Sequence, residues 1–171
     1  MKKRPLHSAA MQGQESPAAG NRDGGQCGAN LNWTLDDEGT LTISGTGAMY
    51  DGLGFFSLLY YDVLDIRAVV VEEGVTSIGE DAFYECLNLE RVTIPDSVTS
   101  IGFGAFFVCP NLKCVTIPSS VTTIGHRAFE DCTSLESVTI PSSVTAIGYD
   151  AFDGTPWFDD LCVFAAVSCP G

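Results

Sequence analysis

Apolar and polar positions recur with a fixed period of 23 residues between about residue 66 and residue 158. Three consecutive segments read LERVTIPDSVTSIGFGAFFVCPN, LKCVTIPSSVTTIGHRAFEDCTS and LESVTIPSSVTAIGYDAFDGTPW, and a looser copy, IRAVVVEEGVTSIGEDAFYECLN, precedes them. A period between about 20 and 50 residues is typical of a solenoid, in which each repeat forms one rung of a stack. We therefore predict four stacked repeats over residues 66–158.

Each copy predicts a short strand, a turn, a second extended piece and one helical turn. In the copy that begins at Leu89, Val92 and Ile94 alternate with polar residues, which is typical of a strand with one buried face. Pro95 ends this strand because proline cannot donate to a sheet. Gly102 is expected either at a positive φ or where a neighbouring rung passes close. Three later apolar residues share one face of the helical turn: Ala105, Phe106 and Cys109.

One copy cannot fold alone, because ordering its backbone costs roughly 1–2 kcal/mol per residue. About eight buried side chains return only roughly 1.5–3 kcal/mol each. Stacked rungs cover one another's apolar faces and pair their strands in a parallel sheet. The predicted buried columns are Val69/Val92/Val115/Val138, Val71/Ile94/Ile117/Ile140, Val75/Val98/Val121/Val144, Ile78/Ile101/Ile124/Ile147 and Phe83/Phe106/Phe129/Phe152.

Residues 27–65 are predicted to form a module that caps the first rung, whose apolar end would otherwise face water. NWTL and TLTISG alternate around an acidic turn that ends at Gly39, which predicts a β-hairpin. The later stretch LGFFSLLYYDVLDI predicts a short helix or buried turn, with partner binding as the alternative. The hairpin's predicted apolar face is Trp33, Leu35, Leu41 and Ile43, and the aromatic residues of the later stretch are Phe55, Phe56, Tyr60 and Tyr61.

The two ends of the chain lie outside the complete repeats. Residues 1–26 are small and polar, and we predict that they form a disordered tail. After Phe158 the 23-residue register continues, so residues 159–171 are predicted to contain the strand of a partial fifth repeat. An uncapped edge strand is a template for pairing, and end-to-end self-association is therefore possible there.

The pattern L-x-x-V-T-I-P-x-S-V-T-x-I-G-x-x-A-F-x-x-C over residues 66–158 resembles the BspA-like (Treponema pallidum-type) leucine-rich repeat. The segment CGANLNWTLDDEGTLTISGTGAMYDG is similar to the N-terminal module that precedes such repeats in bacterial surface proteins. The resemblance implies a leucine-rich repeat solenoid, mainly β with short helical turns and an N-terminal hairpin cap. It also implies a secreted or cell-surface protein that binds host matrix proteins or neighbouring cells.

The formal net charge is −14. A surface this acidic repels phosphate backbones and anionic lipid, so neither nucleic acid nor a membrane surface is expected as a partner. The sequence holds no run of 18 or more apolar residues, so we predict no membrane insertion. The N-terminus is basic but lacks an apolar segment, and no signal peptide is visible. Either the gene start is clipped or the protein stays inside the cell, and we favour the first.

The chain offers little for catalysis or metal binding. Cys86, Cys109 and Cys132 share one column and are expected to be buried free thiols. There is no C-x-x-C pair, and the acidic hairpin turn alone is weak evidence for calcium, so we predict no metal site. H-E-x-x-H, G-x-S-x-G and phosphate-loop motifs are also missing from the sequence. We therefore predict no enzyme, no catalytic residue and no cofactor.

Function is expected at outward positions that vary between copies. These lie along the strands, after the repeat's glycine and on the helical turn. Phe103 and Phe107 are predicted to be exposed, with packing against an adjacent rung as the alternative. The candidate partner-contact residues are Arg91, Thr93, Phe103, Phe107, Thr116, His126, Thr139 and Tyr149.

These observations favour a non-catalytic protein-binding or adhesion module of a bacterial surface or secreted protein. Its expected partners are host matrix proteins or bacterial surface proteins. One alternative is a structural scaffold or stalk without a ligand of its own. Another alternative is an intracellular regulator, which rests only on the missing signal peptide.

Overall fold

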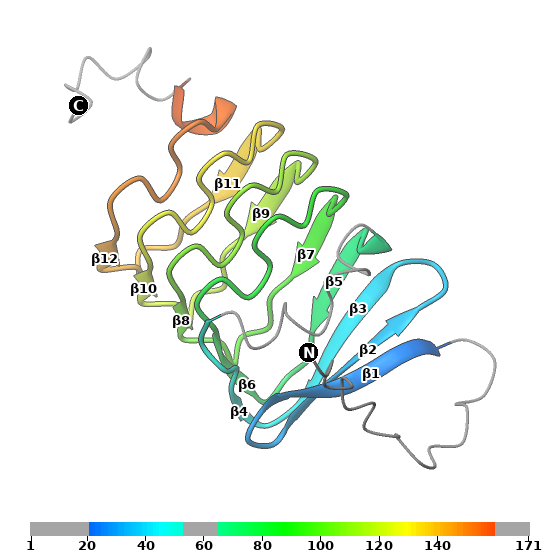
Figure 1. Cartoon of the computed structure of the whole chain (residues 1–171). Coiled ribbons are helices and arrows are strands. Elements are labelled where there is room, and N and C mark those ends of the chain that lie inside the picture. The colour runs from blue at the N-terminus through cyan, green and yellow to red at the C-terminus, as the bar shows by residue number, and fades with distance from the viewer. Residues whose placement is uncertain (1–20, 53–64, 160–171) are drawn as a thin grey trace, which may run out of the picture.

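The computed structural model describes residues 21–52 and 65–159, and within them two sheets run side by side along a stack of rungs (Figure 1). The seven-stranded sheet has the order β1-β2-β3-β5-β7-β9-β11, and the five-stranded sheet has the order β12-β10-β8-β6-β4. The first sheet comprises β1 Asn21–Gly28, β2 Leu31–Asp36, β3 Thr40–Gly45, β5 Ala68–Val71, β7 Arg91–Thr93, β9 Cys114–Thr116 and β11 Ser137–Thr139. The second comprises β4 Gly47–Ala48, β6 Val75–Ile78, β8 Ser100–Ile101, β10 Thr123–Ile124 and β12 Ala146–Ile147.

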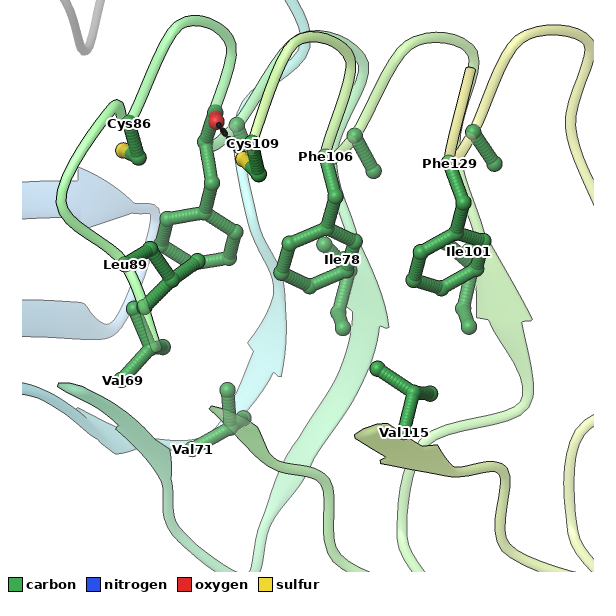
Figure 2. Close-up of a cluster of buried hydrophobic side chains, with 14 of the residues drawn as sticks. Val69, Val71, Ile78, Cys86, Leu89, Ile101, Phe106, Cys109, Val115 and Phe129 are labelled. Carbon is green, nitrogen blue, oxygen red and sulfur yellow. Dashed lines mark hydrogen bonds between the residues drawn. The ribbon is translucent and has the colours of Figure 1, made fainter. Parts of the chain in front are cut away.

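The rungs stack in the predicted 23-residue register. In the first sheet β5, β7, β9 and β11 pair in parallel, each with the next, and Val69 lies opposite Val92. In the second sheet β6, β8, β10 and β12 do the same, and Ile101 lies opposite Ile124. The phenylalanine column is buried, and Phe106 and Phe129 lie in successive rungs with ring centroids 5.1 Å apart (Figure 2). Phe152 continues the stack at 5.2 Å from Phe129. The prediction of a leucine-rich repeat solenoid with a shared apolar interior is confirmed.

The N-terminal hairpin extends the solenoid sheet. β2 and β3 are antiparallel, with Trp33 opposite Ile43, and Gly39 in the connecting turn has a φ of 83°. β3 then pairs in parallel with β5, so the hairpin covers the first rung as predicted. Its apolar face is buried at all four predicted positions: Trp33, Leu35, Leu41 and Ile43.

β1 corrects the predicted boundary of the N-terminal tail. This strand begins at Asn21, whereas the sequence suggested disorder up to residue 26. Gly24 and Gly25 gave the segment the composition of a loop. The backbone nevertheless pairs with β2, and the indole of Trp33 occupies the space beside Gly25, where a Cβ atom would lie 2.9 Å from Nε1.

The predicted helical turn is also corrected. In residues 81–85 the chain forms consecutive turns, because Asp81 and Glu85 take left-handed φ values of 52° and 55°. Alternate N–H groups of this segment donate to the next rung, and that of Phe83 donates to the carbonyl of Ala105 at 2.7 Å. Val108 has a φ of 58°, which is strained for a β-branched residue. The left-handed columns are Asp81/Gly104/Arg127/Asp150 and Glu85/Val108/Asp131/Gly154.

The repeat's glycine column marks a close approach between rungs, one of the two predicted alternatives. A Cβ atom at Gly125 would lie 2.6 Å from the carbonyl carbon of Gly102 and 2.6 Å from the backbone nitrogen of Phe103. A Cβ atom at Gly102 would in turn lie 2.7 Å from the carbonyl carbon of Gly79. Real Cβ atoms do not approach backbone this closely, so a side chain would push adjacent rungs apart.

Side-chain donors of one rung bond carbonyl oxygens of the rung before it. The Ser97 hydroxyl donates to Val75 at 2.7 Å, and the Thr99 hydroxyl donates to Thr76 at 3.1 Å. The Cys109 thiol donates to the carbonyl of Phe83 at 3.2 Å (Figure 2). The same contacts recur in the later pairs Ser120–Val98, Ser143–Val121, Thr122–Thr99, Thr145–Thr122 and Cys132–Phe106. These recurring polar residues therefore have an architectural role.

The last described rung has an open outer side. Ile147 is 50% exposed, whereas the equivalent Ile124 is 2% exposed. A cavity of about 890 Å³ lies there, lined in part by Ile147, Tyr149 and Phe158. Residues 156–159 are helical, so Phe158 does not begin a strand. Residues 160–171, with most of the predicted fifth repeat, and the aromatic residues Phe55, Phe56, Tyr60 and Tyr61 lie outside the described residues.

The buried thiols predict a loss of stability at alkaline pH. Burial raises the pKa of Cys27 to about 11 and raises the pKa values of Cys86 and Cys109 further. The unfolded chain therefore loses thiol protons first, above its ordinary pKa of about 8.5, and each affected thiol weakens folding by roughly 1.4 kcal/mol per pH unit until its folded-state pKa is reached. Urea unfolding between pH 8 and 10 should show this fall, and Cys109→Ala should reduce its slope. An unchanged slope in the variant would contradict the burial of this thiol.

Candidate functional site

The first candidate surface is the outer face of the seven-stranded sheet, called the strand face here. Arg91 and Thr93 are exposed on β7, and Thr116 and Thr139 are exposed opposite each other on β9 and β11. Thr42 of β3 extends this surface across β5, because Thr42 lies opposite Val70 on one side and Thr93 of β7 lies opposite Val70 on the other. The four predicted residues therefore share one surface of small hydroxyl groups and one guanidinium.

Charges on the strand face alternate from rung to rung. One exposed charged residue precedes the strand in each of four successive rungs: Arg67, Glu90, Lys113 and Glu136. Backbone hydrogen bonds connect each to the next, from Glu90 to Arg67 at 2.9 Å, from Lys113 to Glu90 at 3.5 Å and from Glu136 to Lys113 at 3.1 Å. Opposite charges in neighbouring positions offset one another, so this edge of the strand face has little net charge.

The second candidate surface is a row of exposed rings, named the aromatic row and formed by Phe103, His126 and Tyr149. Phe103 is 40% exposed and Tyr149 is 80% exposed. The rings of His126 and Tyr149 stack with centroids 5.5 Å apart, and the backbone N–H of Tyr149 donates to Nδ1 of His126 at 2.8 Å. The three residues occupy equivalent positions in successive rungs, so the row follows the stack axis.

Phe107 departs from the expected exposure. It is half-buried, and its ring lies 5.4 Å from that of Tyr84 in the preceding rung. The guanidinium carbon of Arg127, in the following rung, lies 6.0 Å from the Phe107 ring centroid. Of the two alternatives from the sequence, packing against adjacent rungs describes Phe107, whereas Phe103 is exposed.

Carboxylates crowd the turns beside the aromatic row. Burial raises the pKa of Glu130, and Asp131, Asp150 and Asp153 raise it further by repulsion. Arg127 opposes this rise, with its Nε 3.3 Å from a Glu130 carboxylate oxygen. The net direction is upward, with burial as the largest cause.

Two features of this region were missed in the sequence. Arg127 and Glu130 have the three-residue spacing of a local ion pair, a signal that could have been found. Tyr50 is 51% exposed, and Asp51 accepts a hydrogen bond from the backbone of Glu80 at 3.0 Å. Tyr50 and Asp51 lie ahead of the first repeat, where the 23-residue period does not predict which side chains are exposed.

The part of the chain that the structure describes contains neither a metal-binding cluster nor a membrane-spanning helix. No cluster of three or more His, Cys, Asp or Glu side chains there has the arrangement of a metal site. The described residues also contain no helix with the length and apolar character needed to cross a bilayer.

The fold matches solved leucine-rich repeat proteins. One from Bacteroides ovatus is 37% identical, with a TM-score of 0.52, over 55% of this chain and 24% of that chain. The T. pallidum leucine-rich repeat protein is 24% identical, with a TM-score of 0.58, over 82% of this chain and 67% of that chain. One from Eubacterium ventriosum is 24% identical, with a TM-score of 0.46, over 78% of this chain and 63% of that chain. This chain thus spans only part of its relatives' lengths.

Sequence comparison gives the family. No curated protein matches the chain significantly. The family model described as the BspA type leucine-rich repeat region matches residues 57–164 in six copies, a range that includes the repeats predicted from periodicity. More than half of the chain is covered by this match, and the parallel rungs have the corresponding architecture. The chain therefore belongs to the BspA type leucine-rich repeat family.

Proposed function

We propose that this chain is a non-catalytic protein-binding module that acts in adhesion as part of a bacterial surface or secreted protein. Membership of the BspA type family supports a repeat module that binds proteins. Repeat architecture suits this role because it presents an extended surface built from equivalent positions. Host matrix proteins and bacterial surface proteins are the proposed partners.

The observation that carries the proposal is the aromatic row. Exposed rings are costly to leave in water, and exposed apolar patches tend to mark contact surfaces. Aromatic side chains also contribute strongly at protein interfaces because they bury a large area with little loss of rotamer freedom. Tyr149 at 80% exposure has the most area to bury on contact. The strand face, with Arg91, Thr93, Thr116 and Thr139, is the second surface proposed to touch the partner.

The double variant Phe103→Ser/Tyr149→Ser tests the aromatic row. The full chain should bind immobilised host matrix proteins or bacterial surface proteins, and the variant should lose at least tenfold in affinity in surface plasmon resonance. Both residues are exposed, so the variant should unfold at a urea concentration close to that of the unmodified chain. The matched variant Thr93→Ala/Thr139→Ala changes two exposed residues of the strand face. It should lose less affinity.

Two results would count against this function. If the unmodified chain binds none of the immobilised proteins, a scaffold or stalk without a ligand of its own becomes the better description. If the strand-face variant loses affinity and the aromatic-row variant retains it, the module binds proteins through the opposite surface. Unfolding curves for all variants separate these outcomes from a failure to fold.

The open side of the last described rung supports a second proposal, end-to-end self-association. Ile147 is 50% exposed on the edge strand β12, beside the 890 Å³ cavity. An exposed edge strand offers unpaired backbone groups to a second copy. Sedimentation velocity should show a monomer–dimer equilibrium that Ile147→Lys shifts to monomer. A monomeric unmodified chain at about 100 μM, or an unchanged equilibrium in the variant, would exclude this contact.

A further inference from the structure

The turns beside the aromatic row have an uneven distribution of charge. Residues 102–111 contain no charged side chain, whereas residues 79–88 before them are acidic. Residues 125–134 and 148–157, which follow in the stack, are also acidic, and Arg127 is the one Arg or Lys in all four segments. Together the four segments form what we call the acidic turn face, and its carboxylates are Glu80, Asp81, Glu85, Glu130, Asp131, Asp150 and Asp153.

Local titration supports an excess of negative charge on this face. A hydrogen bond with Glu85 raises the pKa of Tyr84, with burial and the nearby charges adding to the rise. For Tyr84 and Glu130, repulsion from nearby carboxylates adds to the rise in pKa, so further negative charge is disfavoured beside these two groups. The carboxylates that repel negative charge beside Tyr84 and Glu130 would attract a cation.

The apolar centre of this face is exposed. Phe103 lies in the uncharged segment 102–111 and is 40% exposed, and Glu80 and His126 flank it at equivalent positions of the adjacent rungs. Protein interfaces commonly combine an apolar centre with a polar rim. The strand face lacks this arrangement, because its edge charges alternate between Arg67 and Glu90.

We propose that the acidic turn face docks a cationic protein segment, with an apolar side chain against Phe103 and lysine or arginine side chains on both sides of it. Adjacent rungs lie about 4.8 Å apart, and an extended peptide advances about 3.3 Å per residue. A cation two residues before the apolar side chain would reach Glu80 and Asp81. A lysine two residues after it faces the same side and lies roughly 3 Å short of the Asp150 rung along the stack, a distance that its long side chain can span. This assignment rests on the proposed protein-binding function and adds the chemistry of the partner.

The test uses the full chain and a fluorescent nine-residue peptide with a central phenylalanine and two lysines on each side. Fluorescence anisotropy at about 100 mM salt should show binding, since exposed charges remain partly unscreened at that ionic strength. The same peptide with a central serine should bind at least tenfold more weakly. Phe103→Ser should weaken binding of the phenylalanine peptide at least tenfold and should remove most of the difference between the peptides.

A matched pair of charge variants locates the cation contacts. Glu80→Gln/Asp150→Asn removes two exposed carboxylates beside the aromatic row, and Glu90→Gln/Glu136→Gln removes two from the strand face. Both variants have the same net charge. The first should weaken peptide binding about tenfold, and the second should change it less than twofold.

Three results would overturn the assignment. They are equal weakening by both charge variants, equal affinity for the phenylalanine and serine peptides, and no binding of either peptide at 1 mM. If these occur while immobilised proteins still bind through Phe103 and Tyr149, the chemistry of the partner is wrong and the protein-binding function stands. If binding to the immobilised proteins is also missing, the function itself fails.

Discussion

Replacing Gly125 with alanine is expected to lower the free energy of unfolding by more than about 3 kcal/mol, above the usual range for overpacking. The added Cβ would lie 2.6 Å from backbone atoms of both Gly102 and Phe103. Backbone held by hydrogen bonds on both sides cannot move as a side chain can. The rungs must therefore separate, and Gly125 donates one of the bonds between them, to Ile101 at 2.9 Å. Urea unfolding followed by far-UV circular dichroism measures the loss.

Gly52→Ala provides the control for this substitution. Gly52 has a φ of 78°, but apart from its chain neighbours no atom of the described residues lies within 4 Å of the position its Cβ would take. Its replacement tests backbone strain without a clash, and roughly 1–2 kcal/mol is expected. If Gly125→Ala costs no more than Gly52→Ala, the glycine column does not mark a close approach between rungs.

Phe129→Ala should lower the free energy of unfolding by about 3–5 kcal/mol, the range for a buried phenylalanine. The Phe129 ring is fully buried between Phe106 at 5.1 Å and Phe152 at 5.2 Å. Its removal breaks two stacking contacts and opens a cavity in the column. Because a solenoid is stabilised by contacts between neighbouring rungs, the rungs beyond residue 129 should unfold at lower urea than those before it.

The two tryptophans allow each end of the stack to be followed. Trp33 lies in the N-terminal hairpin, whereas Trp157 contacts Phe152 with ring centroids 5.0 Å apart. In a Trp33→Phe background, the fluorescence of Trp157 should report an earlier midpoint than circular dichroism in Phe129→Ala. Phe103→Ala, at an exposed phenylalanine, should cost less than about 1 kcal/mol. Coincident transitions in Phe129→Ala would contradict the separation of the rungs.

The buried columns could be predicted from sequence because register and periodicity suffice to define them. Phe83 and Phe106 occupy equivalent positions 23 residues apart, and their rings stack at 5.1 Å. The hairpin face was equally accessible, since strict alternation places Trp33 and Leu35 on one side. In the repeats, one residue's environment follows from its equivalents in other copies, and in the hairpin it follows from the alternation within one strand.

The turn conformation could not be predicted in the same way. Asp81 and Glu85 are compatible with a helix in sequence, and the left-handed φ values follow from bonds to the next rung. β1 was hidden for a related reason, because Gly25 is accommodated by the Trp33 indole, a contact between distant positions. Tertiary contacts outweigh local propensity in both segments.

The candidate site was predictable in part. Phe103 and Tyr149 vary between copies and are exposed as expected. Phe107 met the same criteria but is covered by Tyr84 and Arg127 from the rungs on either side. Such covering depends on the directions of long side chains, which the repeat pattern alone does not specify.

The hydroxyl and thiol contacts between rungs have a consequence for synthesis. Ser97, Thr99 and Cys109 each donate to a carbonyl that occurs earlier in the chain. As the nascent polypeptide leaves the ribosome from its N-terminus, each of these side-chain donors meets an acceptor that has already emerged. The hairpin can therefore serve as a starting template for these side-chain contacts, whereas turn N–H groups such as that of Phe83 are paired only when the next rung is added.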